Sequence, residues 1–407
     1  MPTTRVHING LILCLASLCA LPGPVATADG GDAPPSPWHY QVYLDVGYAY
    51  SNNNPANDEW RSKSTTNRLN NLELFLAMGD VRKDPTPGSR WGFEFGLQTG
   101  IDSEGLVTEP PPPALTPIDN ADSWRHLYRA NVSYLVDAGR GLRLTGGLIN
   151  SYIGYESFLA IDNPNYTRGY ILDTVPYFMI GLETVWDVSE RVDLSFFLTS
   201  GYNYLTRPND VPSPGLQVAW TVSASTTFKQ NLYYGPDQAD TGIEFWRFLS
   251  DTIVEWKKGR VLLAGAVDFG TERQAGLPGQ PRANWASGAL WARWQLAPRW
   301  SVALRPEFYW DPDGLITGAE QFIHAYTGTV KYEFSPRHHR LVGTFEVRYD
   351  RSTGEQGGFY EGPDNMLAPD QPLALIGLLW SFDGHTRPAS SRRLLSSPEC
   401  PETRSGG

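Results

Sequence analysis

The segment Trp300–Asp313, WSVALRPEFYWDPD, alternates between two kinds of side chain. Successive side chains of a β-strand point to opposite faces, so the segment is predicted to be a strand with two different faces. A soluble sandwich would bury the apolar face in a core, whereas a transmembrane barrel would turn it to lipid and line a wet lumen with the charges. The apolar parity holds Trp300, Val302, Leu304, Pro306, Phe308 and Trp310, and the other parity holds Ser301, Ala303, Arg305, Glu307, Tyr309 and Asp311.

The same alternation recurs along the chain. Each clean stretch lasts about ten residues, the length that a tilted strand needs to cross a bilayer. In one stretch Leu72, Leu74, Leu76 and Met78 share a face opposite Phe75, and in another Tyr128 belongs to the apolar face. Further examples are Tyr40–Tyr50, Trp91–Leu97, Val192–Leu198, Trp246–Trp256 and Gly343–Tyr349.

Long and short connections alternate between these segments. Most of the short ones carry Asp, Gly, Pro or Ser, the residues of tight turns. Long loops on one side and tight turns on the other are typical of a transmembrane antiparallel up-and-down β-barrel, and a sandwich has no reason to keep that order. We therefore predict an all-β barrel of about 16 strands, with 14 to 18 also compatible. The long links are Ser51–Leu69, Asp102–Asp122, Ser151–Tyr177, Asn203–Pro214, Gly235–Glu244, Thr271–Ala283, Pro312–Gln321 and Ser352–Pro372.

The two ends of the chain differ from its centre. Residues 1–28 have Arg5, an apolar stretch and a small-x-small site, so they are predicted to be a secretory signal peptide. We expect residues 29–37 to be a short periplasmic lead-in, residues 38–382 the barrel and residues 383–407 a disordered tail. The net charge of −11 argues against nucleic acid as a partner.

Short sequence motifs in order along the chain resemble the OmpL-like putative beta-barrel porin family of Gram-negative bacteria. The resemblance covers Trp38–Phe382 and implies a single-domain outer-membrane barrel that acts as a porin. The chain departs from the usual barrel pattern after Phe382, where a terminal strand normally closes the chain. The motifs are Asp45–Asn53, Ala130–Tyr134, Gly146–Ile149, Gly154–Glu156, Asp162–Arg168 followed by Pro176, Thr199–Asn203, Tyr233–Pro236, Arg305–Gly314 and Glu346–Asp350.

Charged residues of both signs lie mid-strand on the predicted wet faces. About sixteen strands leave an aqueous channel, so these residues are expected to line it and set its field. The alternative is a closed interior in which the charges pair with one another and leave no pathway. The predicted pore-lining residues are Glu94, Arg129, Asp251, Arg305, Glu307, Glu346 and Arg348.

The third long link, Ser151–Tyr177, is the longest. In general porins the third external loop folds inward and narrows the channel, so by that resemblance we predict that this loop is the constriction. An ordinary surface loop is the alternative. The residues expected to act there are Tyr152, Tyr155, Glu156, Asp162, Arg168 and Asp173.

The sequence predicts no metal, cofactor or catalytic residue. The Asp311–Gly314 motif lacks the ladder of oxygens of a calcium loop and is better explained as a tight turn. His338 and His339 would face opposite ways on a strand and could not share a metal. The histidines expected on strands, His39, His126 and His324, have no Ser at same-face spacing that could serve as a nucleophile.

These observations predict an outer-membrane porin that lets small hydrophilic solutes or ions diffuse passively through a charged lumen. The alternative is a non-conducting barrel whose long loops bind a partner or serve envelope structure. The expected partners are outer-membrane lipid, the barrel-assembly machinery and small polar solutes or ions. Porins of this size are often trimers, so a homotrimer is also considered.

Overall fold

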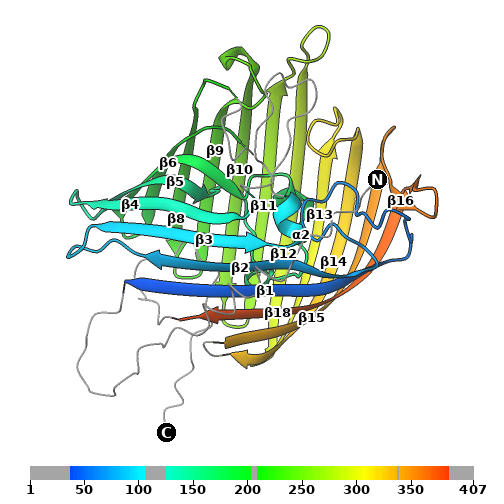
Figure 1. The fold of residues 1–407 in the computed structure, drawn as a ribbon, viewed down its shortest axis with the longest axis horizontal. Coiled ribbons are helices and arrows are strands. Elements are labelled where there is room, and N and C mark those ends of the chain that lie inside the picture. The colour runs from blue at the N-terminus through cyan, green and yellow to red at the C-terminus, as the bar shows by residue number, and fades with distance from the viewer. Residues whose placement is uncertain (1–36, 106–124, 203–208, 337–338, 385–407) are drawn as a thin grey trace, which may run out of the picture. The chain divides into compact units, whose positions relative to one another are not determined.

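The structure is a computed structural model that describes residues 37–105, 125–202, 209–336 and 339–384. The predicted signal peptide, nearly all of the lead-in and the tail from residue 385 lie outside these residues. Sixteen of the described strands form one closed barrel (Figure 1). They are β1 (Trp38–Ser51), β2 (Leu72–Lys83), β3 (Trp91–Thr99), β4 (Leu127–Val136), β5 (Leu142–Asn150), β6 (Phe178–Ser189), β7 (Val192–Thr199), β8 (Ser213–Ser223), β9 (Thr226–Pro236), β10 (Trp246–Lys258), β11 (Val261–Arg273), β12 (Arg282–Ala297), β13 (Trp300–Asp311), β14 (Gln321–Pro336), β15 (His339–Thr353) and β18 (Asp370–Asp383).

Each barrel strand pairs antiparallel with the next one in the chain, and β1 closes the sheet against β18. In Figure 1 the blue β1 and the red β18 lie side by side, as their register from Gln41↔Asp383 to Ser51↔Leu373 requires. Closure leaves no unpaired strand edge, which lipid could not satisfy by hydrogen bonding. The predicted all-β antiparallel barrel of about sixteen strands is confirmed.

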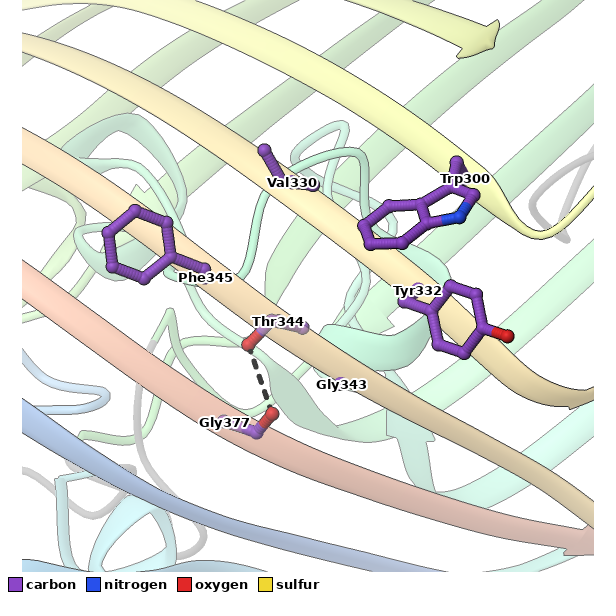
Figure 2. Close-up of a pocket in the computed structure, with 7 residues that line it drawn as sticks. All are labelled: Trp300, Val330, Tyr332, Gly343, Thr344, Phe345 and Gly377. Atoms are coloured by element: carbon purple, nitrogen blue, oxygen red, sulfur yellow. Dashed lines mark hydrogen bonds between the residues drawn. The ribbon is translucent and has the colours of Figure 1, made fainter. Parts of the chain in front are cut away.

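The barrel wall has an apolar outer face and a polar inner face. On β13 the side chain of Leu304 is 61% exposed, whereas that of the adjacent Arg305 is fully buried inside the barrel. The outer face also carries a shallow apolar depression of about 240 Å³ between Trp300, Tyr332 and Phe345, with Gly343 beside them (Figure 2). This depression opens outward, so it is separate from the lumen.

Two β-bulges place some residues of β2 and β4 on a different face of the barrel wall from the one predicted. The register jumps from Asp45↔Leu76 to Val46↔Leu74 and skips Phe75, so the strand changes parity there. Leu72 is 73% exposed, but Leu76 is buried inside the barrel, and the prediction that both share a face is wrong. A similar jump beside Gly96 skips the residue at position 128. The apolar assignment of that residue, Tyr128, to the outer face is also wrong, because its ring is buried against Phe158.

The connections agree with the predicted alternation of long and short links. Residues 151–177 join β5 to β6, as predicted. Three of the other long connections hold short elements in their described residues: α2 (Ile101–Gly105), η2 (Ile243–Phe245) and a hairpin of β16 (Phe359–Glu361) and β17 (Met366–Ala368). The third loop itself contains η1 (Ala160–Asp162) and α4 (Tyr170–Asp173). Among the described residues, no helix is long and apolar enough to cross a membrane.

Candidate functional site in the barrel lumen

Residues 151–177, here called the third loop, lie inside the barrel. The loop is closed at its base by a hydrogen bond from the Ser151 amide to the Tyr177 carbonyl at 3.0 Å. Tyr166, Arg168 and Tyr170 near its tip are fully buried. Burial of this extent requires contact on all sides. The loop therefore packs against the inner wall of the barrel and is not an ordinary surface loop.

A chain of alternating charges connects the third loop to β13 and β15. Arg305 Nη1 lies 2.7 Å from Glu156 Oε1 on the loop, and Arg305 Nε lies 3.3 Å from Glu307 Oε1. Arg348 joins the same Glu307 oxygen at 3.1 Å and Asp350 Oδ1 at 2.7 Å. Buried ions are stable only when paired and hydrogen bonded, so this charge cluster fixes the loop against the wall.

Wall carboxylates also accept hydrogen bonds from the backbone of the third loop. Glu346 accepts from the amides of Tyr166 at 2.7 Å and Thr167 at 3.2 Å, while Glu307 accepts from the Tyr170 amide at 2.7 Å. A side chain at Gly169 would place its Cβ 2.6 Å from Glu307 Oε2, so only glycine allows this approach. The wall thus satisfies backbone donors that an irregular loop would otherwise bury unpaired.

Cationic and aromatic contacts complete the attachment of the third loop. Lys331 on β14 donates to the carbonyls of Ala160 at 2.9 Å and Asn163 at 2.6 Å. Tyr152 stacks on Phe197 with ring centroids 3.8 Å apart, close enough to add dispersion and aromatic stabilisation. The loop therefore reaches from β7 across the lumen to β13, β14 and β15.

Residues 52–71, which connect β1 to β2 and are here called the first loop, bind the third loop. Lys63 forms a buried ion pair with Asp173 and donates to the Arg168 carbonyl at 2.7 Å. Arg168 in turn forms a buried ion pair with Asp102 of α2, whose carboxylate accepts from the Thr66 amide at 2.7 Å. These two ion pairs join the first loop, α2 and the third loop into one unit, here called the clasp.

The clasp favours the charged form of Asp173. Burial alone would raise the pKa of this carboxyl, but the Lys63 ammonium and hydrogen bonds from Lys63, Thr65 and Tyr177 outweigh it and hold the pKa below its ordinary value. A depressed carboxyl pKa stabilises the folded state above the ordinary value of about 4, and that contribution is lost as acid protonates the group. Acid should therefore weaken the clasp.

Replacing Lys63 by Met is expected to release the first loop, because Asp173 would remain buried without a cation. Proteinase K digestion of the folded protein should then cleave within residues 52–71 faster than in the unchanged protein. Arg68→Gln is the matched control on the same loop, since the Arg68–Glu59 pair is exposed and contributes little. Equal cleavage rates for Lys63→Met and Arg68→Gln would contradict the clasp.

The structure brings most of the predicted site residues together. Tyr152, Tyr155, Glu156, Arg168 and Asp173 lie on the third loop inside the barrel. The sixth loop residue, Asp162, is more exposed and pairs with Arg340 at 3.3 Å. Of the residues predicted to line the pore, those that contact the third loop are Asp251, Arg305, Glu307, Glu346 and Arg348.

Glu94 and Arg129 lie apart from that group. They occupy β3 and β4, with Arg129 Nε 3.8 Å from Glu94 Oε2. Nearby strands carry Arg82 and the Arg143–Glu183 pair, whose charged atoms are 3.8 Å apart; the Arg143 side chain is 38% exposed. Accessible lumen charges of both signs are thus present on β2 to β6.

Sequence reasoning missed several residues of the site. Besides Lys331 they include Asp45, which accepts from the Tyr166 hydroxyl at 2.9 Å, and Asp350, which accepts from the Tyr170 hydroxyl at 2.8 Å. All three have the inward parity of their strands, so the alternation could have identified them. Lys63 and Asp102 had no such signal, because the first loop and α2 show no periodicity. Their roles follow only from the way the loops pack together.

A closed antiparallel barrel with an apolar outer wall, a charged interior and a loop folded inward defines an outer-membrane β-barrel of the porin class. The chain belongs to the family described as "Putative beta-barrel porin-2, OmpL-like", whose family model matches residues 38–382. The family resemblance inferred from the motifs and the Gram-negative outer-membrane location are confirmed. A search of curated protein sequences finds no match.

Solved porin structures share this fold at low sequence identity. An anion-selective porin from Comamonas acidovorans has a TM-score of 0.53 at 13% identity, with 85% of this chain and 99% of that chain covered. The outer membrane channel DcaP of Acinetobacter baumannii has a TM-score of 0.51 at 6% identity, covering 85% and 96%. OmpT of Vibrio cholerae has 0.52 at 10%, covering 85% and 97%. These likenesses concern the fold alone.

Proposed function

We propose that this protein is a porin through which small hydrophilic solutes or ions diffuse passively. The observation that carries the proposal is the lumen wall of β2 to β6, where Arg143 and its neighbours present accessible charges of both signs inside a closed barrel. In a fully packed interior without water, charges would be buried and closely paired, whereas the charges on this wall are partly exposed and loosely paired. Family membership supports the same function.

The two groups of predicted pore residues are proposed to act differently. Glu94, Arg82, Arg143 and Glu183 face the solute directly. Arg129 is only 7% exposed, with its guanidinium against the Tyr128 ring, and acts through its pair with Glu94. The other predicted pore-lining residues act through the third loop, because their charged groups bind the loop and hold it in place. They are Asp251, Arg305, Glu307, Glu346 and Arg348.

Single-channel recording in planar lipid bilayers tests this proposal. The purified, folded protein should give discrete conductance steps, and Arg143→Glu should shift the reversal potential in a salt gradient toward cation selectivity, since it reverses a charge on the proposed path. Arg351→Glu is the control, because Arg351 lies on β15 in an exposed pair with Asp370. An absence of steps, or an equal shift in both variants, would reject the proposal.

A second candidate is a non-conducting barrel whose long loops bind a partner or support the envelope. The observation in its favour is the dense burial of the first and third loops, with Trp60 and Tyr170 at or below 2% exposure. Conductance steps that are absent from the unchanged protein and appear only after the third loop is shortened would favour this alternative, because they would mean that the loop seals the lumen.

The remaining expectations are part of the same proposal. The exposed apolar wall contacts outer-membrane lipid, and the barrel-assembly machinery inserts the chain. A homotrimer is compatible with this fold. The chemistry proposed is transport without catalysis, and neither a metal nor a cofactor takes part.

A further inference from the structure

Five polar side chains form a row across neighbouring strands at one height of the lumen. Their backbone positions are paired in sequence from strand to strand, and all five face inward. Opposed side chains on adjacent strands contact one another directly, so the row acts as a connected network. Its members are Gln217 on β8, Asn231 on β9, Asp251 on β10, Asp268 on β11 and Ser287 on β12.

Hydrogen bonds satisfy one half of the row. Gln217 donates to Asn231 Oδ1 at 2.8 Å, and Asn231 donates to Asp251 Oδ2 at 2.8 Å. The same Asp251 oxygen accepts from the Gly154 amide at 2.7 Å, which attaches the beginning of the third loop to β10. Gly154 has φ +97°, a left-handed conformation that favours glycine, so this attachment constrains the backbone.

The other half of the row brings two carboxyl groups together. Asp251 Oδ1, Asp268 Oδ1 and Ser287 Oγ are buried, the two carboxyl groups lie within hydrogen-bonding reach of each other, and the Ser287 hydroxyl lies within reach of Asp268. Two buried carboxylates facing one another would repel and would each lack solvation. This arrangement therefore requires a positive charge or a proton between them.

A proton fits this arrangement better than a metal ion. The described residues contain no group of three or more His, Cys, Asp or Glu side chains that could hold a metal. Calcium takes six to eight oxygen ligands, whereas this row offers three oxygens that are shielded from water. One proton between Asp251 and Asp268 would satisfy both oxygens and leave the Ser287 hydroxyl free to donate to Asp268.

We infer that Asp251 and Asp268 share one proton and act as positioning residues for the third loop. The shared proton fixes the Asp251 carboxyl in the orientation that accepts from the Gly154 amide. Loss of that proton produces two adjacent carboxylates, which separate and weaken the attachment of the loop. The expected effect on conductance rests on the proposed function, because it requires that the third loop narrows the path of the solute. The shared proton itself does not depend on the proposed function.

Charged and titratable groups surround the pair on several elements. Lys229 on β9 lies near Asp251 and can balance the single negative charge that remains after protonation. Glu255 on β10 is bound by Tyr155 of the third loop at 2.7 Å. Tyr309 on β13 and Tyr202 lie on the Asp268 side, next to Arg247. The positive charge of Lys229 favours the charged form of the carboxyl pair, and Glu255 competes with Asp251 for that charge.

Two measurements test the inference. Infrared spectroscopy of the folded protein should show a protonated-carboxyl band that disappears on alkaline titration and is missing from Asp268→Asn. In bilayers the unchanged protein should show larger and noisier conductance as pH rises. Asp268→Asn should remove this pH dependence, because its amide donates to Asp251 at every pH. Asp193→Asn, a lumen carboxyl on β7 outside the row, should leave both results unchanged.

A protein without the protonated-carboxyl band, or a pH profile that is identical with and without Asp268→Asn, would overturn the inference. Should Asp268→Asn fail to fold, Asp251→Asn takes its place in the infrared titration, because either substitution removes one of the two carboxyl groups that share the proton. If the protein gives no conductance at any pH while the band titrates, the proposed function fails and the shared proton stands.

Discussion

Replacing residues 157–168 by a short Gly-Ser linker should raise the single-channel conductance severalfold. This segment holds most of the loop contacts that cross the lumen, including those of Lys331 and Glu346. Its two ends already lie close together, because the Gly169 amide donates to Glu156 Oε2 at 2.7 Å. A short linker can therefore close the gap without distorting the strands, and the measurement is the step size in planar bilayers.

The barrel should survive this change, since its strands keep all their backbone pairs. The wall charges would exchange loop contacts for water, which solvates them at least as well. Deleting residues 275–280 from the loop between β11 and β12 provides the control, because that loop is not part of the third loop or the clasp. Step sizes that stay the same after loss of 157–168 would show that the third loop does not limit the path.

Much of the architecture could be predicted because the bilayer imposes a local rule. A strand between lipid and water must alternate residue by residue, so β13 shows its two faces in sequence alone. Turn residues likewise mark the short links, so the sequence predicts a long third loop at residues 151–177. The inward position of Arg305 and Glu307 follows from the same rule.

The rest depends on contacts between residues that are distant in the sequence. The bulges at Phe75 and Tyr128 reverse the parity of their strands, and a bulge is defined by the partner strand rather than by local sequence. The Lys63–Asp173 and Arg168–Asp102 ion pairs connect loops with no periodic pattern. Sequence reasoning therefore predicted which wall residues face inward but not which of them the third loop would cover.

Replacing Leu304 by Arg is expected to destabilise the folded barrel by about 2–4 kcal/mol, the cost of a cation on the lipid face near the bilayer midplane. Leu304 is 61% exposed on the outer wall in the middle part of β13, and its cross-strand partners, Ala292 on β12 and Gly328 on β14, carry no charge. The measurement is reversible unfolding in denaturant, with the protein inserted in lipid vesicles.

Leu304→Ala separates the effect of charge from the loss of a large side chain. Alanine removes contacts with lipid but adds no charge, so its cost should be well below that of arginine. The comparison is informative because Arg305, the next residue, is fully buried and paired with Glu156 and Glu307. The same strand would then contain a stable arginine at position 305 and lose stability when arginine is placed at position 304. Equal stability of the Leu304→Arg and Leu304→Ala variants would mean that the outer wall does not face lipid.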